Sequence, residues 1–343
     1  MAIITIVGAG MMGSAMAFPA SDKGNEVHIV GTEHSHATID ALKAGQEHPG
    51  LKRKLPQCVQ VHSFEEGKPF IRQADLVING VSSPGLPWFE QSVLPLVSDG
   101  KPVLFLAKGL EDHDGTLIPY PVMCTRRLEP KRRISFLGAT GPCISAELAD
   151  RHDTLTCYCG PKREVLEYVK SLLDAPYYHI SLSDDMVGME FAAALKNAYG
   201  LGVSLAQGRA HARRDNEGHN SAAALFLQSC REARRIIRLY GGSSEAFDCF
   251  AGDLYVTVFA GRTRLLGSLL GQGIPYRKAK ETLKGVTLES VVAATTVAKA
   301  LRERGDIDPS EFPLLRLIDD MIRHDAKARI PWNAFDEKHF RFD

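Results

Sequence analysis

Lys196 lies in the stretch 190–197, EFAAALKN, whose small and apolar residues predict a largely buried helix. Lysine is almost never buried without a partner, so a lone lysine in such a helix usually occupies its exposed side. A second stretch offers partners, because Asp253 and Thr257 are four residues apart and face one side of a helix or tight turn. We therefore single out these three residues as a candidate polar cluster.

Two arginines follow this second stretch, Arg262 and Arg264, and both lie close to Gly261. A guanidinium group donates paired hydrogen bonds to phosphate oxygens, so two of them next to a glycine suit a phosphate-binding loop. An arginine pair on its own more often marks an exposed face. The interpretation therefore depends on the residues that the fold brings beside it.

Three glycines near the N-terminus, Gly8, Gly10 and Gly13, have the spacing G-x-G-x-x-G between a β-branched run at 3–7 and a stretch of small residues. In this strand-to-helix setting the first glycine allows a tight turn, the second lets a pyrophosphate approach the backbone, and the third lets helix and strand pack closely. Free N–H groups at the start of the helix then face the phosphates. We therefore predict a dinucleotide site, although Pro19 is expected to kink or end the helix.

An acidic residue follows the second predicted strand, which covers 26–30. Glu33 lies roughly 20 positions beyond the last glycine, near the place where a carboxylate binds the ribose of a dinucleotide. It strengthens the dinucleotide interpretation, because the glycine spacing alone is a weak signal.

Predicted strands alternate with helix-length segments through the first half of the chain, which is typical of a doubly wound parallel sheet of the Rossmann type. Further strands are predicted at 74–81, 103–107, 134–137 and 154–159, the last of which closes the series. From Met186 onward helical periodicity dominates, at 190–199, 221–240, 243–253, 277–283, 289–304 and 312–323. The sequence thus predicts an α/β dinucleotide-binding domain at 1–187 and an all-helical substrate-binding and catalytic domain at 188–343. We expect the helical domain to close over the carboxyl ends of the strands and form a cleft.

Composition excludes several classes of protein. The chain has 343 residues, of which 44% are hydrophobic and 24% charged, and its 41 basic residues balance 41 acidic ones. No net charge therefore favours nucleic acid or a membrane surface as a partner. No apolar run is long enough to cross a membrane, and the first strand begins directly after Met1, which leaves no room for a signal peptide. The seven cysteines lack metal-ligand spacing and are interpreted as reduced thiols of a cytoplasmic protein without a metal site.

With these motifs, the chain resembles the NAD(P)-dependent sn-glycerol-3-phosphate dehydrogenases over nearly its whole length. Any one motif could occur by chance, but seven in register are specific to this family. The matching pieces, in chain order, are Gly8-Ala9-Gly10-x-x-Gly13, Ala107-Lys108-Gly109, Gly141-Pro142 with Glu147, Glu190 through Ala194-Leu195-Lys196-Asn197, Gly252-Asp253-Leu254 with Thr257, Gly261-Arg262, and Leu288-Glu289. The resemblance implies hydride transfer between a nicotinamide cofactor and the pair sn-glycerol 3-phosphate and dihydroxyacetone phosphate.

The resemblance also implies catalytic roles. Lys196 would protonate the carbonyl oxygen of dihydroxyacetone phosphate and act as the base in the reverse reaction. An ammonium group among apolar neighbours loses hydration, which lowers its pKa toward the working pH. Lys108 would be a second cation near the substrate that also holds down the pKa of Lys196. Asp253 would orient Lys196 by a hydrogen bond, with the hydroxyl of Thr257 nearby.

Binding roles are implied for a further set of residues. Asn197 and Arg262 would hold the substrate phosphate, and Arg262 would also reach the cofactor. Ser145 occupies a position that is usually Ala in the family, beside the nicotinamide, and Glu289 matches a residue near the cofactor. The cofactor-binding set is then Gly8, Gly10, Met11, Met12, Gly13, Glu33, Ser145, Arg262 and Glu289.

Two departures from the family pattern bear on specificity. Where the family commonly has Asn after the arginine, this chain has Thr263, which donates one hydrogen bond to a phosphate but lacks the reach of an amide. The substrate pocket is therefore altered, and a related phosphorylated ketone is an alternative substrate. Many bacterial relatives carry an arginine pair after the second strand, where this chain has Glu33. A carboxylate there repels a 2′-phosphate, so of NAD and NADP the sequence favours NAD. NADP is the alternative, because the side chains of Thr32, His34, Ser35 and His36 can donate to a 2′-phosphate if Glu33 turns outward.

The sequence leaves two other functions open. A dehydrogenase of the hydroxyacid or ketopantoate type shares the two-domain plan but does not need both Arg262 and the Gly252-Asp253-Leu254 motif. A dinucleotide sensor without activity would not need Lys108, Lys196, Asp253 and Thr257 together. The expected partner is a small phosphorylated substrate, and a homodimer is compatible with these features.

Overall fold

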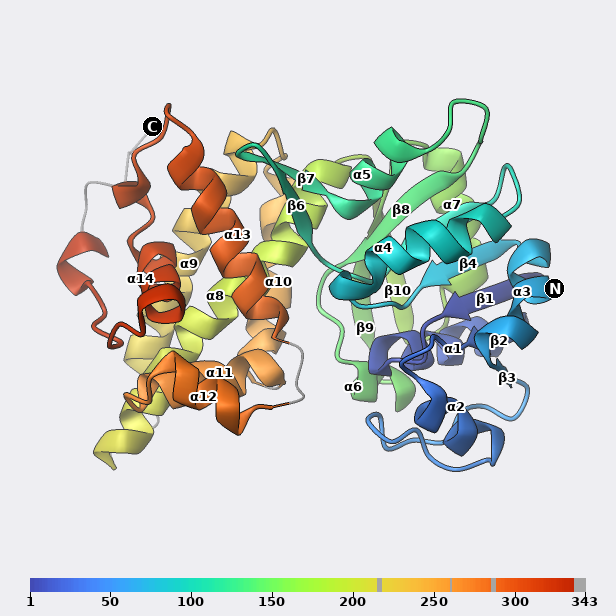
Figure 1. Cartoon of the computed structure of the whole chain (residues 1–343), viewed down its shortest axis with the longest axis horizontal. Coiled ribbons are helices and arrows are strands. Elements are labelled where there is room, and N and C mark those ends of the chain that lie inside the picture. Colours follow the sequence, from blue (N-terminus) through green and yellow to red (C-terminus); the bar gives the residue numbers. More distant parts are fainter. Residues whose placement is uncertain (215–217, 260, 285–287, 336–343) are drawn as a thin grey trace. The chain divides into compact units, whose positions relative to one another are not determined.

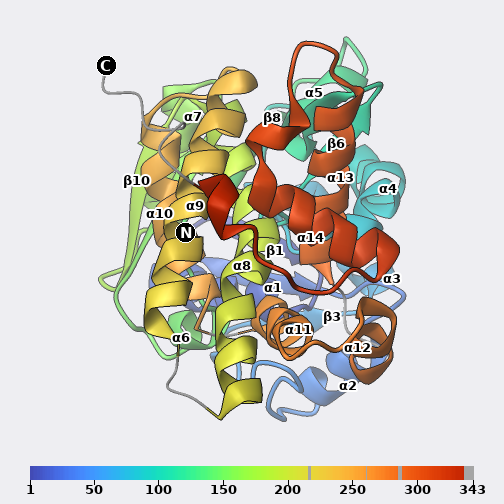
Figure 2. The same cartoon turned by 90° about the vertical axis from the view of Figure 1, so that its left-hand side faces the viewer.

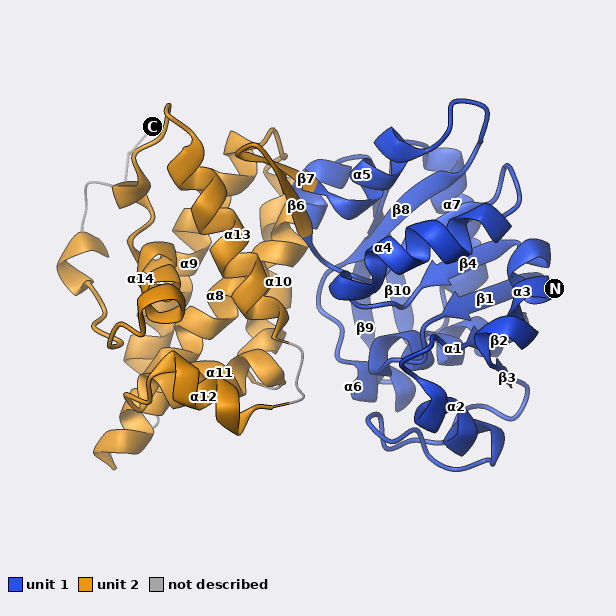
Figure 3. Cartoon of the chain, viewed as in Figure 1, with its two compact units in different colours: residues 1–109, 119–190 blue, residues 110–118, 191–343 orange. Residues whose placement is uncertain are grey.

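The computed structural model describes residues 1–214, 218–259, 261–284 and 288–335. The chain divides into two compact units, one of residues 1–109 and 119–190 and the other of residues 110–118 and 191–343 (Figure 3). The second unit therefore takes in a short piece of the first half of the chain, which the sequence did not reveal.

The first unit is built on one sheet of eight strands (Figure 1). Its strands are β1 (Ile3–Val7), β2 (Glu26–Val30), β3 (Gln60–His62), β4 (Leu76–Asn79), β5 (Pro102–Phe105), β8 (Ser135–Thr140), β9 (Thr154–Cys159) and β10 (Tyr178–Ser183). Its helices are α1 (Met11–Asp22), α2 (His36–Lys43), α3 (Phe64–Gln73), α4 (Leu86–Trp88), α5 (Tyr120–Arg127), α6 (Ser145–Ala149) and α7 (Arg163–Leu173).

The strand order is β10-β9-β8-β5-β4-β1-β2-β3. The six strands from β3 to β8 pair in parallel and follow the order of a doubly wound dinucleotide-binding sheet, which confirms the predicted fold class. Two details differ from the prediction. The predicted strand 154–159 is present as β9, but it pairs antiparallel with β8, and it does not close the series because β10 follows it.

Alternating residues of the parallel strands feed two separate cores, as expected for a sheet covered on both faces. Ile4 and Ile6 belong to a core that includes residues of α1, α6 and α7. Val7 belongs to the other core, which includes residues of α3 and α5. Of the two predicted effects of Pro19, a kink or an end of the helix, the second does not occur, because α1 continues past it to Asp22. Only the last turn lies beyond Pro19, so few helical hydrogen bonds depend on it.

The second unit is helical apart from one hairpin (Figure 2). The hairpin is made of β6 (Leu110–His113) and β7 (Thr116–Pro119), and the helices are α8 (Met186–Arg213), α9 (His219–Leu239), α10 (Glu245–Thr257), α11 (Arg262–Gly271), α12 (Tyr276–Thr282), α13 (Glu289–Glu303) and α14 (Pro313–His324). Helix α8 begins in the first unit and contributes most of its length to the second. Among the described residues, no helix has the length and apolar character needed to cross a membrane.

Helix α8 is longer than the predicted segment 190–199 because it is buried on nearly all sides and so lacks an amphipathic period. Helix α11 approaches α8 closely because glycines of α11 face it. A Cβ at Gly267 or Gly271 of α11 would clash with the backbone of α8 at Leu201 or Leu205. Helix α11 itself was not predicted, and it begins at Arg262.

Candidate active site

Lys196 lies at the centre of a polar cluster inside the helical unit. Its Nζ donates a hydrogen bond of 2.8 Å to Oδ1 of Asp253 and one of 3.0 Å to Oγ1 of Thr257. The lysine side chain is 14% exposed and the aspartate 1%, so the ion pair is largely shielded from water. A buried ammonium group with a carboxylate partner is held in one position. The sequence analysis expected such a hydrogen bond from Lys196 to Asp253.

Two helices position this cluster. Lys196 is the one residue between 188 and 206 of α8 that is not buried. Asp253 and Thr257 lie one turn apart on α10, and the hydroxyl of Thr257 donates a 2.7 Å hydrogen bond to the carbonyl oxygen of Asp253. Because that proton is committed to the backbone, a lone pair of Oγ1 is directed at the lysine. The ammonium group is therefore held by two fixed acceptors on α10.

Gly200, one turn after Lys196, lets α10 and α11 come close to α8. A Cβ there would lie 2.8 Å from Cγ2 of Thr257 and 3.3 Å from Cγ2 of Thr263. The methyl groups of both threonines therefore pack against the same point of α8. The structure brings Thr263 close to the residues that bind Lys196, as a substrate-binding role for it requires.

Other predicted substrate-binding residues make no interaction with this cluster in the described ranges. Asn197 is buried, with 8% exposure, and its side chain forms no hydrogen bond with a described residue. Arg262 is exposed as the first residue of α11, so the predicted phosphate-binding loop is instead the start of a helix. Arg264 is held in place, because it donates to Oε1 of Gln207 and to the carbonyl oxygen of Phe259. It is therefore less available for phosphate than the sequence indicated.

Lys108 lies at the edge of the sheet in the first unit, just beyond β5. Its Nζ donates to the carbonyl oxygen of Gly141 at 3.3 Å. The register of β5 and β8 explains this contact: Phe105 pairs with Gly138, and Lys108 and Gly141 each lie three positions further along the chain, just beyond the two strands. The cation is thus at the carboxyl end of the parallel strands, where doubly wound sheets bind ligands.

Glu190 is a buried carboxyl group that the sequence did not single out for a role. It is 1% exposed, and neither of its oxygens has a hydrogen-bond partner among the described residues. Its carboxyl group fills the space left by Gly138, where any Cβ would clash with it. Burial raises the pKa of Glu190 to about 8, and the charge of Lys108 opposes this shift. The signal was present in the sequence, since a glutamate beside FAAAL is a carboxylate in an apolar stretch.

The glycine turn has the geometry of a dinucleotide cradle. Gly8 has a φ of +108°, and a Cβ there would lie 2.7 Å from the backbone of Gly80. A Cβ at Gly13 would clash with the carbonyl oxygen of Gly8. Gly10 differs, because a Cβ there would meet only Gly80 O at 3.7 Å, an ordinary contact. Protein packing therefore explains the first and third glycines, and a close approach by a ligand is the remaining reason for the second.

Helix α1 begins directly after this turn, and no side chain caps its start at Gly10. Met11, the first residue of α1, is 44% exposed, and Met12 is half-buried. The first N–H groups of a helix lack partners within the helix, so they are available to an anion. The residues present therefore fit the pyrophosphate of a dinucleotide.

The end of β2 lies against the glycine turn, since Gly8 donates its N–H to the carbonyl oxygen of Val30 at 2.8 Å. Glu33 follows three residues later with its side chain 66% exposed, 3.6 Å from Nε2 of His34. The hydroxyl of Ser35 is used within this loop, because it accepts from the N–H of Thr32 and donates to the carbonyl oxygen of the same residue. Glu33 thus has an exposed carboxylate beyond β2.

Two predicted cofactor residues begin helices. Ser145 is the first residue of α6 and is 9% exposed, and Glu289 is the first residue of α13 and is half-buried. No hydrogen bond in the described ranges joins either residue to another predicted site residue. Their roles therefore stay predictions.

Comparison with known proteins agrees with the motifs. The model of the NAD-dependent glycerol-3-phosphate dehydrogenase N-terminus matches residues 3–165, and that of the C-terminus matches residues 185–331. An NADP(+)-dependent glycerol-3-phosphate dehydrogenase of Archaeoglobus fulgidus is 31% identical over 323 residues, which cover 94% of each chain. A glycerol-3-phosphate dehydrogenase [NAD(P)+] of Corynebacterium aurimucosum is 26% identical over 93% of this chain and 92% of its own.

A solved structure shows the same fold. The glycerol-3-phosphate dehydrogenase of Coxiella burnetii superposes with a TM-score of 0.79 over 97% of each chain, at 20% sequence identity. Matches to both halves of the chain and a relative of this similarity over nearly the full length confirm the resemblance found from the motifs. The chain belongs to the NAD-dependent glycerol-3-phosphate dehydrogenase family.

Proposed function

We propose that this chain interconverts sn-glycerol 3-phosphate and dihydroxyacetone phosphate with a nicotinamide cofactor. The observation that carries the proposal is the buried cluster of Lys196, Asp253 and Thr257 in a member of this family. An inert dinucleotide-binding protein has no need of a shielded ammonium group held by two fixed acceptors. The named relatives agree with the reaction, since they are glycerol-3-phosphate dehydrogenases.

Lys196 moves the proton of the reaction. The bound nicotinamide supplies or accepts the hydride. In the direction of reduction, negative charge develops on the carbonyl oxygen of the ketone, and Nζ of Lys196 donates a proton to that oxygen. In the reverse direction the neutral amine takes the proton of the hydroxyl group. Such transfer contributes roughly 10²–10⁴-fold to the rate.

Asp253 and Thr257 orient Lys196. Their oxygens hold Nζ at 2.8 and 3.0 Å, so the ammonium group need not reorganise when charge develops on the substrate. Lys108 acts as a second cation near the substrate, and its contact with the carbonyl oxygen of Gly141 keeps it at the carboxyl end of the strands.

The substrate phosphate is held by Asn197, Arg262 and Thr263. Arg262 is exposed and forms no ion pair with any residue that the structure describes, so its guanidinium group is available for a phosphate. The amide of Asn197 is likewise uncommitted in those residues. Thr263 supplies its single hydroxyl, and its methyl group packs toward Gly200.

The cofactor is bound by the glycine turn, with Gly8, Gly10, Met11, Met12 and Gly13 around the pyrophosphate, and Ser145, Arg262 and Glu289 contribute elsewhere. We propose NAD in preference to NADP, because the exposed carboxylate of Glu33 hydrogen-bonds free ribose hydroxyls and repels a 2′-phosphate. The relative from Archaeoglobus fulgidus is named as NADP(+)-dependent, so this preference sets the two proteins apart.

The test is a substrate comparison. Purified protein is mixed with NADH or NADPH and separately with dihydroxyacetone phosphate, oxaloacetate or ketopantoate, and the absorbance of the reduced nicotinamide is followed. Oxidation with dihydroxyacetone phosphate alone supports the proposal. Oxidation with one of the other two instead identifies a hydroxyacid or ketopantoate type of dehydrogenase. Cofactor binding without turnover of any substrate identifies a dinucleotide sensor.

A further inference from the structure

Two cavities in the helical unit share the last turns of α8. The larger has a volume of about 480 Å³, and its lining includes Arg209, Arg213, Ser221 and Trp332. The smaller has a volume of about 300 Å³, and both arginines line it together with Lys327 and Arg329. Because Arg209 and Arg213 border both cavities, the two are contiguous. Their volumes lie in the range of small-molecule sites.

The lining of both cavities is strongly cationic. Among the residues that the structure describes, four basic side chains line them, and no aspartate or glutamate does. Side chains of Arg213, Lys327 and Arg329 form no hydrogen bond or ion pair with any residue in the described ranges. Arg209 donates one hydrogen bond, to the carbonyl oxygen of Ala328.

Two other cations of the same unit do have acidic partners. Arg277 pairs with Asp325, and Arg302 with Asp319. Like charges that gather repel one another, and an anion among them removes that cost. The positions of the basic side chains therefore indicate an anionic ligand with more than one charge.

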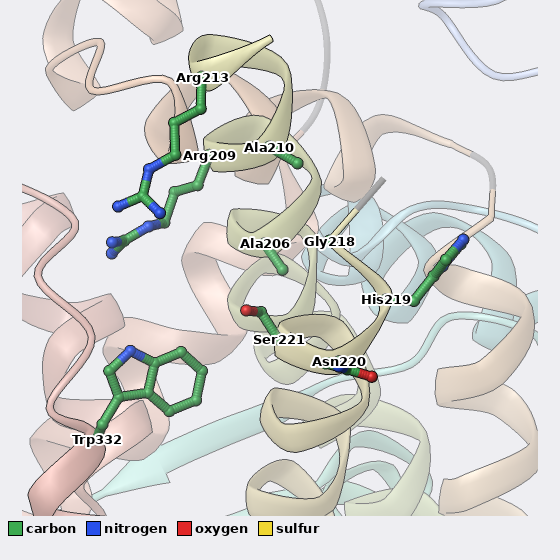
Figure 4. Close-up of a pocket in the computed structure, with 9 residues that line it drawn as sticks. All are labelled: Ala206, Arg209, Ala210, Arg213, Gly218, His219, Asn220, Ser221 and Trp332. Atoms are coloured by element: carbon green, nitrogen blue, oxygen red, sulfur yellow. The ribbon is translucent and has the colours of Figure 1, made fainter. Parts of the chain in front are cut away.

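An aromatic ring lies beside the arginines. In Figure 4 the side chains of Arg209 and Arg213 leave α8 in the same direction, toward the space bordered by the indole of Trp332. This indole is 41% exposed, and its neighbour Phe335 contacts it edge to face. An exposed indole face offers a surface on which a planar base stacks.

We propose that the two contiguous cavities form a binding site for a nucleoside polyphosphate. The base lies in the larger cavity against Trp332, and the phosphates lie between the two arginines, Lys327 and Arg329. None of these residues belongs to the cluster around Lys196 or to the glycine turn, so the proposal is independent of the proposed enzymatic reaction.

Calorimetric titration with ADP tests the proposal on the full chain, with NADH at saturation so that the dinucleotide site is filled. ADP is expected to bind, with an affinity that falls as salt is raised, because several cations contact its phosphates. The double variant Arg209→Gln, Arg213→Gln is expected to bind at least about tenfold more weakly, since it loses two charge-assisted contacts. Trp332→Leu is expected to weaken the binding of ADP, whose base stacks on the indole, and to leave the binding of pyrophosphate, which has no base, unchanged.

The matched control is the double variant Arg238→Gln, Lys278→Gln, which removes two exposed cations of the same unit that line neither cavity. Its affinity for ADP is expected to equal that of the wild type. Three results would each overturn the proposal: no binding of ADP to the wild type at low salt, loss of that binding when NADH is added, or equal affinity of the Arg209 and Arg213 double variant. Thermal unfolding of each variant shows whether it is folded under the conditions of the titration.

Discussion

Lys196→Met removes the ammonium group and keeps most of the apolar volume of the side chain. If Lys196 is the proton donor, kcat falls by about 10²–10⁴-fold, which corresponds to about 3–5 kcal/mol of transition-state stabilisation. Affinity for NADH is expected to change little, because the predicted dinucleotide site is the glycine turn. The variant therefore separates the chemical step from cofactor binding.

The same substitution has a structural cost that the burial of the pair predicts. Asp253 is 1% exposed, so without Lys196 its carboxylate is left buried without its ionic partner. Removal of one member of a buried ion pair destabilises a protein by about 3–5 kcal/mol. Adding Asp253→Leu to Lys196→Met removes the remaining charge and is expected to recover much of that loss. Activity should stay absent in the double variant.

Three measurements check this reasoning: kcat at saturating substrate and cofactor, the dissociation constant of NADH from its fluorescence, and the midpoint of urea unfolding. The single variant should be slow and less stable, and the double variant slow and more stable than the single one. A kcat above half of the wild-type value in Lys196→Met would refute the role of Lys196. Wild-type stability of the single variant would refute the shielded ion pair.

Three further predictions concern the first unit. Glu33→Ala should lower the affinity for NADH more than that for NADPH, because the carboxylate that is removed binds a free ribose and repels a 2′-phosphate. Glu190→Gln should flatten the loss of stability between about pH 4.5 and 8. Burial raises the pKa of Glu190 from 4.5 to about 8, so the folded chain keeps a proton that the unfolded chain releases. This contribution to stability is fully present below pH 4.5 and is lost as the pH rises through 8. Gly10→Ala should leave the unfolding midpoint nearly unchanged and weaken the binding of NADH. Gly8→Ala should instead destabilise the fold, since the φ of Gly8 is +108° and its Cβ would lie 2.7 Å from the backbone of Gly80.

Each of these predictions has a result that contradicts it. A larger loss for NADPH than for NADH in Glu33→Ala would overturn the cofactor preference. For Glu190→Gln, the decisive comparison is the unfolding midpoint at pH 6 and pH 9, and an unchanged difference between the two pH values would exclude this carboxyl group as the cause. For the glycines, unaltered NADH binding by Gly10→Ala would show that no ligand approaches that position.

Local sequence was sufficient where the fold depends on local rules. The turn at Gly8, Gly10 and Gly13 was predictable because each glycine has its own steric or ligand-related reason, and the strands on either side have clear β-branched patterns. The family resemblance was carried by short motifs of the same kind. Lys196 and Asp253 could be paired only because both motifs were known to occur together, since 57 positions separate them.

Features that depend on tertiary packing were not predictable in the same way. Helix α8 is buried on nearly all sides, so no polar face marked its length, and α11 packs through glycines that normally disfavour a helix. The reversed direction of β9 depends on its pairing with β8, which no local pattern encodes. The cationic cavities combine Arg209 with Arg329 across more than a hundred residues, so their charges had no common signal in the sequence.

The most direct test of the account is a crystal structure of the protein with dihydroxyacetone phosphate and the oxidised cofactor bound together. The account predicts Nζ of Lys196 within about 3.2 Å of the carbonyl oxygen of the substrate, while its bonds to Asp253 and Thr257 are kept. A ternary complex in which that amine lies beyond hydrogen-bond reach of the oxygen, with another group in its place, would contradict it.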